Sequence, residues 1–488
     1  MFYLVGLFAA QLQHPTPVAA SPKASWHMED EESSMPPSDH PNVWYLPHQS
    51  SLFQPRSVGP YTLHQVNVDA NGLNILGDAA NEPSMTVDPT NNQRIAITWR
   101  QFDNVSSNFR QAGNAYTTDG GARWHNNMVL TPGTFRSDPV LDTRADGAEF
   151  YFSNLPTATQ SDQWYSTNRG MTYSGPYFSY GGDKQWIVTD KNPASPGYNN
   201  LYQSWSNFSS GTSGATFSRS KDGGRTWFTP TAVPTAPTFG VNFMGNSGDV
   251  MVVGTRTNNV GLCFARSTNP YTTGTVSWTS SIITSTYDVV NGASINPDGL
   301  AGQVWGAVAP TTSAYSGTIY VLTTVGNFSG QPTSVVLWKS TNNGSTWTGP
   351  TRIDTNLGTA TSTYHWFGAI GVAPNGRLDV CYNDCGLDAN PASPTTCVTV
   401  YRSSSDNGVT WTAPKQLTIP WKFGVGYPQQ NKIGDYNQII SDDTGCHYVF
   451  AATFNNEEDV YYIRIGNATG PIRPPYPRPG SGSQSVGF

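Results

Sequence analysis

The chain has 488 residues, of which 12% are charged and 12% are aromatic, and its net charge is -7. It contains no basic cluster to neutralise phosphates and no run of about 18 apolar residues, which argues against a nucleic-acid-binding protein and against a membrane-spanning helix. Few charges, 48 glycines and many Tyr and Trp residues indicate short strands joined by polar turns.

The N-terminal region is predicted to lie outside the folded domain. Residues 1–20 have an apolar core and a small-residue exit at Val18–Ala20, which is typical of a signal peptide, although the first basic residue is Lys23. A disordered arm without a leader is the alternative. We expect a poorly ordered arm over 21–61, one domain over 62–466, and a Pro-rich, then Gly/Ser-rich tail over 467–488. A leader predicts a secreted or cell-surface protein.

One short pattern recurs along the domain. The stretch "SKDGGRTW", Ser220 to Trp227, follows the frame S-x-D-x-G-x-T-W. The same frame returns in "STNNGSTW" and "SSDNGVTW", more loosely in "TTDGGARW" and "STNRGMTY", and with an insertion in "STNPYTTGTVSW". The Asp or Asn positions of the five better copies are Asp119, Asn168, Asp222, Asn342 and Asp406. Six copies in one chain indicate an internally repeated fold.

The frame has the chemistry of a hairpin turn. Ser and Asp side chains can hydrogen-bond to nearby backbone amides, and the glycine tolerates a positive φ. The threonine starts the next strand, and the aromatic residue buries a large surface against a neighbouring unit. A spacing of roughly fifty residues with about four strands per unit is typical of a β-propeller blade. We therefore predict an all-β propeller of four-stranded antiparallel blades, seven in number, with six as the alternative.

A second set of short sequence segments, called unit-start words below, marks where each repeat unit begins. They occur at Glu82, Asp138, Asp183, Asp249, near Asn291, at His365 and at Asp435. The last of these seven units has no copy of the turn. Either "YTLHQVNV" or "LNIL", from the N-terminal side, is expected to add a strand to the last blade and close the ring.

These turns resemble the Asp-box (bacterial neuraminidase repeat) propellers, the superfamily that includes the sialidases. The resemblance covers roughly residues 75 to 465, and it implies that each box lies between the third and fourth strands of a blade, away from the central channel. The five box residues Asp119, Asn168, Asp222, Asn342 and Asp406 are accordingly expected to be structural. The unit-start words resemble those of secreted microbial propellers described as sialidase-like.

The resemblance places the unit starts around the channel mouth, because the innermost strand of each blade lines the channel. The candidate catalytic residues are Glu82, Asp138, Asp183 and Asp435. The candidate substrate-binding residues are Arg136, Lys184, Trp186, His365, Trp366 and Tyr436. The carboxylates have three interpretations: a pair acting on a glycosidic bond, oxygen ligands for a cation such as Ca²⁺, or caps on strand ends.

One departure from the family concerns substrate recognition. Sialidases grip the substrate carboxylate with three arginines, the first in an Arg-Ile/Leu-Pro word, and this chain offers only "PRSVGP" at Arg56 and "QRIAI" at Arg94. Two functions therefore stay open. One is glycoside hydrolysis by the mouth carboxylates. The other is a non-catalytic surface propeller, with Ca²⁺ as a candidate stabilising ion, that binds a glycan, matrix or protein. The expected partner is a glycan or glycoprotein, and the expected state is a monomer.

The five cysteines are too few for a disulfide scaffold. Cys385 and Cys397 flank a turn-rich loop and could form a disulfide, and Cys381 and Cys446 could pair between units, which leaves Cys263 alone. Five ordinary buried thiols are the alternative.

Overall fold

The computed structural model describes residues 49–52, 56–206, 211–256, 260–288 and 295–466. The predicted leader (1–20), the tail from 467 and most of the predicted arm lie outside the described residues. The described part is all β-structure without a helix, and within it no helix could cross a membrane.

Seven four-stranded antiparallel blades form a ring, as the sequence predicts. The first blade contains β4 (Ala79–Val87), β5 (Ile95–Phe102), β6 (Arg110–Thr117) and β7 (His125–Val129). The second contains β8 (Ser137–Thr143), β9 (Phe150–Thr157), β10 (Gln160–Ser166) and β11 (Ser174–Phe178). The third contains β12 (Trp186–Thr189), β13 (Leu201–Ser204), β14 (Ala215–Ser220) and β15 (Thr231–Ala232).

The next three blades follow in the same order along the chain. The fourth contains β16 (Asn242–Met244), β17 (Val250–Thr255), β18 (Val260–Ser267) and β19 (Thr279–Asp288). The fifth contains β20 (Trp305–Val308), β21 (Ile319–Phe328), β22 (Gln331–Ser340) and β23 (Thr348–Arg352). The sixth contains β24 (His365–Val372), β25 (Leu378–Asp384), β26 (Thr396–Ser404), β27 (Lys415–Gln416) and β28 (Trp421–Lys422), which pairs with β26.

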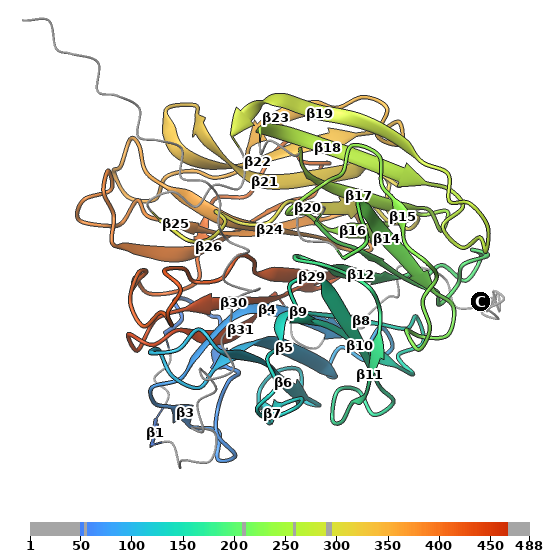
Figure 1. Cartoon of the computed structure of the whole chain (residues 1–488). Coiled ribbons are helices and arrows are strands. Elements are labelled where there is room, and N and C mark those ends of the chain that lie inside the picture. Colours follow the sequence, from blue (N-terminus) through green and yellow to red (C-terminus); the bar gives the residue numbers. More distant parts are fainter. Residues whose placement is uncertain (1–48, 53–55, 207–210, 257–259, 289–294, 467–488) are drawn as a thin grey trace, which may run out of the picture.

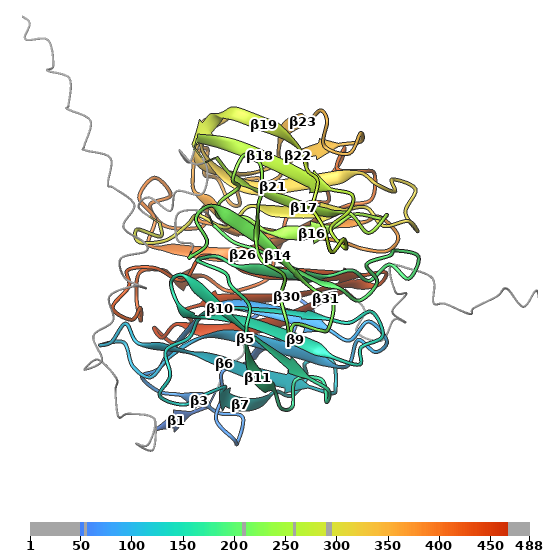
Figure 2. The ribbon, with the colours of Figure 1, turned by 45° about the vertical axis from the view of Figure 1, so that its right-hand side comes forward.

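The seventh blade is assembled from both ends of the described chain. It contains β29 (Gln438–Asp442), β30 (Gly445–Ala452) and β31 (Asp459–Gly466), and its outermost strand is β2 (Leu63–Gln65). Leu63 lies opposite Ile463, so the "YTLHQVNV" segment closes the ring. The "LNIL" segment forms β3 (Asn74–Ile75) instead and pairs with β1 (Ser50–Ser51). Figure 1 shows the first strand of each blade toward the middle and β7, β11, β19 and β23 at the periphery, and Figure 2 shows the same arrangement from another side.

The repeated turn connects the third and fourth strands in the first six blades. In the third blade, Asp222 Oδ1 accepts hydrogen bonds from the backbone N–H of Thr226 at 2.9 Å and of Arg225 at 3.1 Å. The hydroxyl of Ser220 donates to Asp222 at 2.8 Å and accepts from the N–H of Gly224 at 2.8 Å. The same Ser or Thr to Asp or Asn bond recurs at Asp119, Asn168, Asn269, Asn342 and Asp406. The polar atoms of these side chains are engaged in hydrogen bonds that hold the turn closed.

Each turn also packs on the blade before it. Trp347 meets Phe264 edge to face with ring centroids 5.2 Å apart, and Trp278 meets Phe217 at 5.0 Å. Trp124 of the first blade meets Tyr462 of the seventh at 5.2 Å, so the contact also crosses the closure. Aromatic pairs in this geometry add about 1 kcal/mol each beyond the area they bury. The turns therefore join neighbouring blades.

All five cysteines are buried free thiols, the second of the two alternatives. Burial raises the pKa of Cys381 and Cys446 well above the ordinary thiol value, so they are protonated at neutral pH. Part of the predicted arm is also in contact with the ring. The N–H of Val58 donates to the carbonyl of Leu417 at 2.8 Å, and the N–H of Ile419 donates to the carbonyl of Arg56 at 2.9 Å.

Candidate functional site

A residue in left-handed backbone conformation stands at the start of the innermost strand in every blade. Non-glycine residues rarely adopt positive φ, so its occurrence at five non-glycine residues, and at two glycines, in the same position of the blade indicates a feature of the fold. The residues and their φ values are Glu82 (51°), Asp138 (45°), Lys184 (54°), Phe239 (52°), Gly302 (124°), Phe367 (55°) and Gly434 (80°). In β4, β8 and β24 the strand register shifts at this point. The unit-start words at Glu82, Asp138, Asp183 and Asp435 fall on it or beside it.

Lys184 lies at the middle of a buried ion cluster. Its Nζ is 3.0 Å from Asp435 Oδ2, 3.2 Å from Asp138 Oδ2 and 3.4 Å from Asp183 Oδ1. The backbone N–H of Lys184 also donates to Asp138 Oδ2, at 3.1 Å. The predicted convergence of these three carboxylates is therefore present, and a lysine from the third blade holds them together.

Two further cations complete the cluster. Lys432 Nζ lies 3.0 Å from Asp435 Oδ2 and 3.7 Å from Glu82 Oε1. Arg100 Nη2 lies 3.2 Å from Glu82 Oε1, and its Nε donates to Asn81 Oδ1 at 2.7 Å. The cluster of Glu82, Asp138, Asp183, Asp435, Lys184, Lys432 and Arg100 is called the central cluster below. It draws on the first, second, third and seventh blades and on the segment that precedes the seventh.

Burial and neighbouring charges shift the pKa values of the carboxyl groups in the central cluster in opposite directions. Burial raises the pKa of Glu82 to about 8, against the opposing effect of Arg100 and Lys184. Burial alone would also raise the pKa of Asp138 and Asp435. Lys184 lowers the pKa of Asp138 below its ordinary value, and Lys432 together with Lys184 lowers that of Asp435. The raised pKa favours the protonated form of Glu82, while the lowered pKa values favour the ionised forms of Asp138 and Asp435.

The Lys184 ammonium occupies the position among carboxylate oxygens where a bound cation would be expected. Burial would lower its pKa, but Asp138, Asp183, Glu82 and Asp435 raise it well above its ordinary value. Within the described residues, no group of three or more His, Cys, Asp or Glu side chains is arranged to hold a metal ion. The oxygens that the sequence suggested for Ca²⁺ are the ones that bind Lys184.

The central cluster is closed off from solvent. The exposed fractions are 0% for Glu82, 1% for Asp138, 3% for Asp183 and 0% for Asp435. Part of the cover comes from the segment before the fifth blade, where the N–H of Leu300 donates to Asp435 Oδ1 at 2.8 Å. Asn296 in the same segment donates to the carbonyl of Gly434 at 2.8 Å. These bonds join segments that lie on different sides of the ring.

Aromatic side chains fill the ring beside the central cluster. Trp186 meets Trp305 at 5.1 Å and Tyr436 at 5.6 Å between ring centroids, both edge to face, which joins the third, fifth and seventh blades. The hydroxyl of Tyr436 donates to the carbonyl of Pro139 at 3.2 Å. Two of the predicted substrate-binding aromatics are therefore buried packing partners across the ring axis.

The other predicted binding residues belong to different buried groups. Arg136 pairs with Asp162 at 3.0 Å and donates to Asn154 at 2.6 Å within the second blade. His365 lies between two carboxylates, with Nδ1 3.2 Å from Asp354 and Nε2 3.1 Å from Asp384. These three side chains are fully buried.

Trp366 packs in the aromatic core of the sixth blade. Its ring centroid lies 4.7 Å from that of Phe367, 5.6 Å from Phe423 and 6.2 Å from Trp421. Trp366 is fully buried, so its face is not open for stacking on a sugar.

Three arginines do not converge on the central cluster within the described chain. Arg100 belongs to it, but Arg136 pairs with Asp162, and Arg377 forms a bidentate pair with Asp379 at 2.8 and 2.9 Å. The arrangement that sialidases use for a substrate carboxylate is thus not assembled from these residues.

Sequence reasoning gave no role to Arg100 and did not identify Lys432. Arg100 lies on β5 opposite Asn81, the residue before Glu82, so the pairing of β4 with β5 brings Arg100 beside Glu82. Lys432 stands three residues before Asp435, a spacing too common in sequences to single out. The prediction for Asp249 was wrong, because Asp249 immediately precedes β17, the second strand of its blade, and pairs with Arg266 at 2.6 Å.

Comparison with family models finds no match, and comparison with curated proteins finds none either. Among solved structures, a protein of unknown function from Dyadobacter fermentans has 10% identity and a TM-score of 0.47, covering 86% of this chain and 100% of its own. An α-L-arabinofuranosidase from Fusarium graminearum has 11% identity and a TM-score of 0.42, covering 84% of this chain and 97% of its own.

A Hadza microbial sialidase has 13% identity and a TM-score of 0.40, covering 79% of this chain and 66% of its own. Values this low assign neither an activity nor a ligand to this chain.

Proposed function

We propose that this protein is a non-catalytic propeller of the Asp-box, sialidase-like kind, secreted or displayed at the cell surface, which binds a glycan or glycoprotein through its outer surfaces. One observation carries the proposal. The four carboxylates predicted to be catalytic are at most 3% exposed, and three of them contact Lys184. A glycosidase needs an acid and a second carboxylate on opposite sides of an accessible glycosidic bond.

In this proposal the central cluster is structural. Lys184, Lys432 and Arg100 lie among the carboxyl groups of Glu82, Asp138, Asp183 and Asp435, so each buried charge of the cluster has a partner of opposite sign. Unpaired buried charges are very unfavourable, whereas a matched group fixes which side chains meet. The ion pairs between Lys184 of the third blade and the Asp residues of the second and seventh blades set the arrangement of the blades around the axis.

Glycoside hydrolysis is the second candidate, and one observation favours it. Glu82, with a pKa of about 8, lies in the same cluster as Asp138, whose pKa is lowered, and glycosidases use such a divergent acid and carboxylate pair. A substrate could reach this pair only after the segment carrying Asn296 and Leu300 moved away from Gly434 and Asp435.

Turnover on a panel of sialosides and neutral glycosides separates the two candidates. The purified chain is expected to release no sugar at any pH between 5 and 8. Release of sugar by the wild type that is abolished by Asp183→Asn, with the folded state checked by thermal melting, would overturn the binding proposal in favour of hydrolysis. N-terminal sequencing of protein recovered from the medium tests secretion and cleavage near residue 20, and light scattering tests the monomer.

A further inference from the structure

The seventh blade lacks an intact copy of the repeated turn because its third and fourth strands come from opposite ends of the chain. In other blades the residue before the turn's Ser or Thr lies opposite the residue that follows the aromatic. The pairs are Tyr116 with His125, Tyr165 with Ser174, and Lys339 with Thr348. In the seventh blade Leu63 lies opposite Ile463, so continuing the register places Tyr61 where the aromatic stands in the other blades.

The missing polar loop changes what lies beside one buried residue of the sixth blade. In the intact cases the turn lies over the residue three positions before the preceding blade's Ser. Trp347 covers Phe264 and Trp278 covers Phe217, while Gly224 and Gly408 approach Gln163 and Leu337. In the sixth blade the equivalent residue, three before Ser404, is Tyr401.

A pocket of about 390 Å³ lies at this place. Its lining includes the two tyrosines Tyr61 and Tyr401 and the three cations Arg377, Lys415 and Arg464. The described lining contains no carboxylate. The cavity therefore combines aromatic surface with positive charge.

The three cations differ in how far they are already paired. Arg377 is held by Asp379, and Arg464 Nη2 lies 2.8 Å from Asp442 Oδ1. Lys415 is exposed, and its Nζ lies 5.8 Å from the centroid of the Tyr401 ring. Among the described residues Lys415 forms no ion pair, so its charge is open to a ligand.

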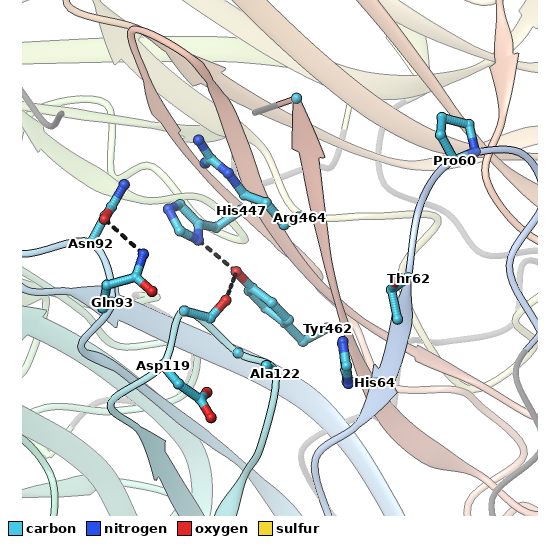
Figure 3. Close-up of a pocket in the computed structure, with 13 residues that line it drawn as sticks. Pro60, Thr62, His64, Asn92, Gln93, Asp119, Ala122, His447, Tyr462 and Arg464 are labelled. Atoms are coloured by element: carbon cyan, nitrogen blue, oxygen red, sulfur yellow. Dashed lines mark hydrogen bonds between the residues drawn. The ribbon is translucent and has the colours of Figure 1, made fainter. Parts of the chain in front are cut away.

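A second pocket, of about 250 Å³, adjoins the first and shares Pro60, Arg464 and Gly466 with it. Figure 3 shows Pro60, Thr62 and His64 along one segment, facing Arg464, Tyr462 and His447. His447 Nδ1 lies 2.8 Å from the Tyr462 hydroxyl, which in turn donates to the carbonyl of Gly120 at 3.1 Å. This pocket offers imidazole and amide groups, including those of Asn92 and Gln93, that suit sugar hydroxyls, and it also contains the carboxylate of Asp119, so the acidic groups of the ligand are expected in the first pocket.

We propose that these two pockets, together called the seam groove, bind an anionic oligosaccharide whose charged groups are carboxylates. A carboxylate of the ligand accepts hydrogen bonds from Lys415, with Arg464 beside it, and the face of a sugar ring lies on Tyr61, which is half-buried, whereas Tyr401 is buried. The hydroxyls of the next sugar face the second pocket. The inference rests on the proposed binding function and assigns it a place and a ligand class. Charge-assisted hydrogen bonds are about twice as strong as neutral ones, so the carboxylate should dominate recognition.

Trigalacturonate and its fully methyl-esterified form are matched probes, because esterification removes the carboxylate charges and adds only a methyl group to each sugar. Calorimetric titration should show the acid binding at least about tenfold more tightly than the ester, with affinity falling as salt rises. Lys415→Ala should weaken binding of the acid by about tenfold and leave that of the ester unchanged. Lys221→Ala, which removes an exposed lysine from the turn of the third blade, is the matched control and should bind as the wild type does.

The possible results distinguish a failure of the seam groove from a failure of the proposed binding function. Equal binding of acid and ester, no binding of either, or equal affinities of the Lys415→Ala and Lys221→Ala variants would overturn the seam groove. Binding of other glycans by the wild type in those cases would leave the proposed function standing. Shortening of the trimer during the titration, detected by mass spectrometry, would instead overturn the proposed function. Melting curves of both variants establish that they are folded, since Lys415 is exposed on a short outer strand.

Discussion

The rim and the centre of the ring differ in how far their residue types vary from blade to blade. At the rim, six turns use nearly the same residues and the same hydrogen bonds, and each packs on its neighbour. At the centre, the seven equivalent positions carry charged residues in the first three blades and phenylalanine or glycine in the others. The turn has the same residue types in each blade because each blade needs it to fold. The residues that meet around the axis differ between blades because their charges and shapes must complement one another.

Properties particular to this chain are therefore expected where neither pattern holds. The polar groups of the rim turns form hydrogen bonds within the turn, so Asp222 and its equivalents have few atoms available to bind a ligand. The charged groups at the centre form ion pairs with one another. The exception is the place where the uniform rim is interrupted, between the sixth and seventh blades. There Lys415, which forms no ion pair with any residue that the structure describes, faces a cavity.

The largest expected effect tests the balance of the centre. Lys184→Met leaves Asp138, Asp183 and Asp435 buried without their shared cation. Breaking a buried ion pair in this way typically costs about 3 to 5 kcal/mol, so the free energy of unfolding should fall by at least that amount. Urea titration or the soluble yield measures it.

The control separates charge balance from loss of a lysine. Lys339→Met removes a lysine whose Nζ donates to the carbonyl of Asn407 at 3.1 Å, and it should cost under about 1 kcal/mol. Adding Asp138→Asn and Asp435→Asn to Lys184→Met should restore part of the lost stability. A Lys184→Met protein as stable as Lys339→Met would refute the structural role of the central cluster.

A smaller effect concerns pH. The folded-state pKa of Glu82, about 8, lies above the value for an exposed glutamate, so folding favours the protonated form. Its stabilising contribution is complete below the ordinary pKa near 4.5 and is lost as pH rises toward 8. Between pH 6 and pH 8 the wild type should lose roughly 1 kcal/mol of stability per pH unit from this group. Thermal melting across that range measures the slope.

Glu82→Gln keeps the shape of the protonated acid and should flatten the slope. Asp103 and Asp459, whose pKa values burial raises to about 7, contribute the same sign and leave a residual slope. Asp146→Asn is the control, since its pKa is lowered and it is ionised throughout this range. An unchanged slope in Glu82→Gln would show that Glu82 is ionised in the folded protein at neutral pH.

The fold was readable from the sequence because the rim turn needs the same side chains in every blade. Ser or Thr, Asp or Asn, Gly and an aromatic at fixed spacing revealed five turns and, with an insertion, a sixth, and with them the blade size. The seventh turn was not readable, because its aromatic place is taken by Tyr61, which is separated from Ile463 by almost the whole domain. Only the strand register relates those two residues.

The candidate site was readable in part. The unit-start words at Glu82, Asp138, Asp183 and Asp435 correctly converge, because a residue with positive φ stands at or just before the innermost strand of each blade. Their burial was not foreseen, since it depends on Leu300 and Lys432, which lie in connections far away in the sequence. In the fourth blade the equivalent position is Phe239, an apolar residue without a polar word beside it, so the sequence pattern points instead to the polar Asp249.

The smallest expected effect sharpens the account of the rim. Gly344, in the turn of the fifth blade, has a φ of +81°, and a Cβ there would lie 2.1 Å from the Phe264 ring of the fourth blade. Gly330, on the same blade, has a φ of +78° with nothing within 4 Å. Alanine at either position carries a similar backbone strain, but only Gly344→Ala also has to displace the neighbouring ring.

Gly344→Ala should therefore be less stable than Gly330→Ala by about 1 to 2 kcal/mol in urea titration. Asparagine tolerates the left-handed conformation, so Gly330→Asn should be almost neutral while Gly344→Asn remains damaging. That pair separates conformation from contact. If both asparagine variants were equally stable, the glycine would serve only the turn itself, and the rim turns would not join neighbouring blades through this position.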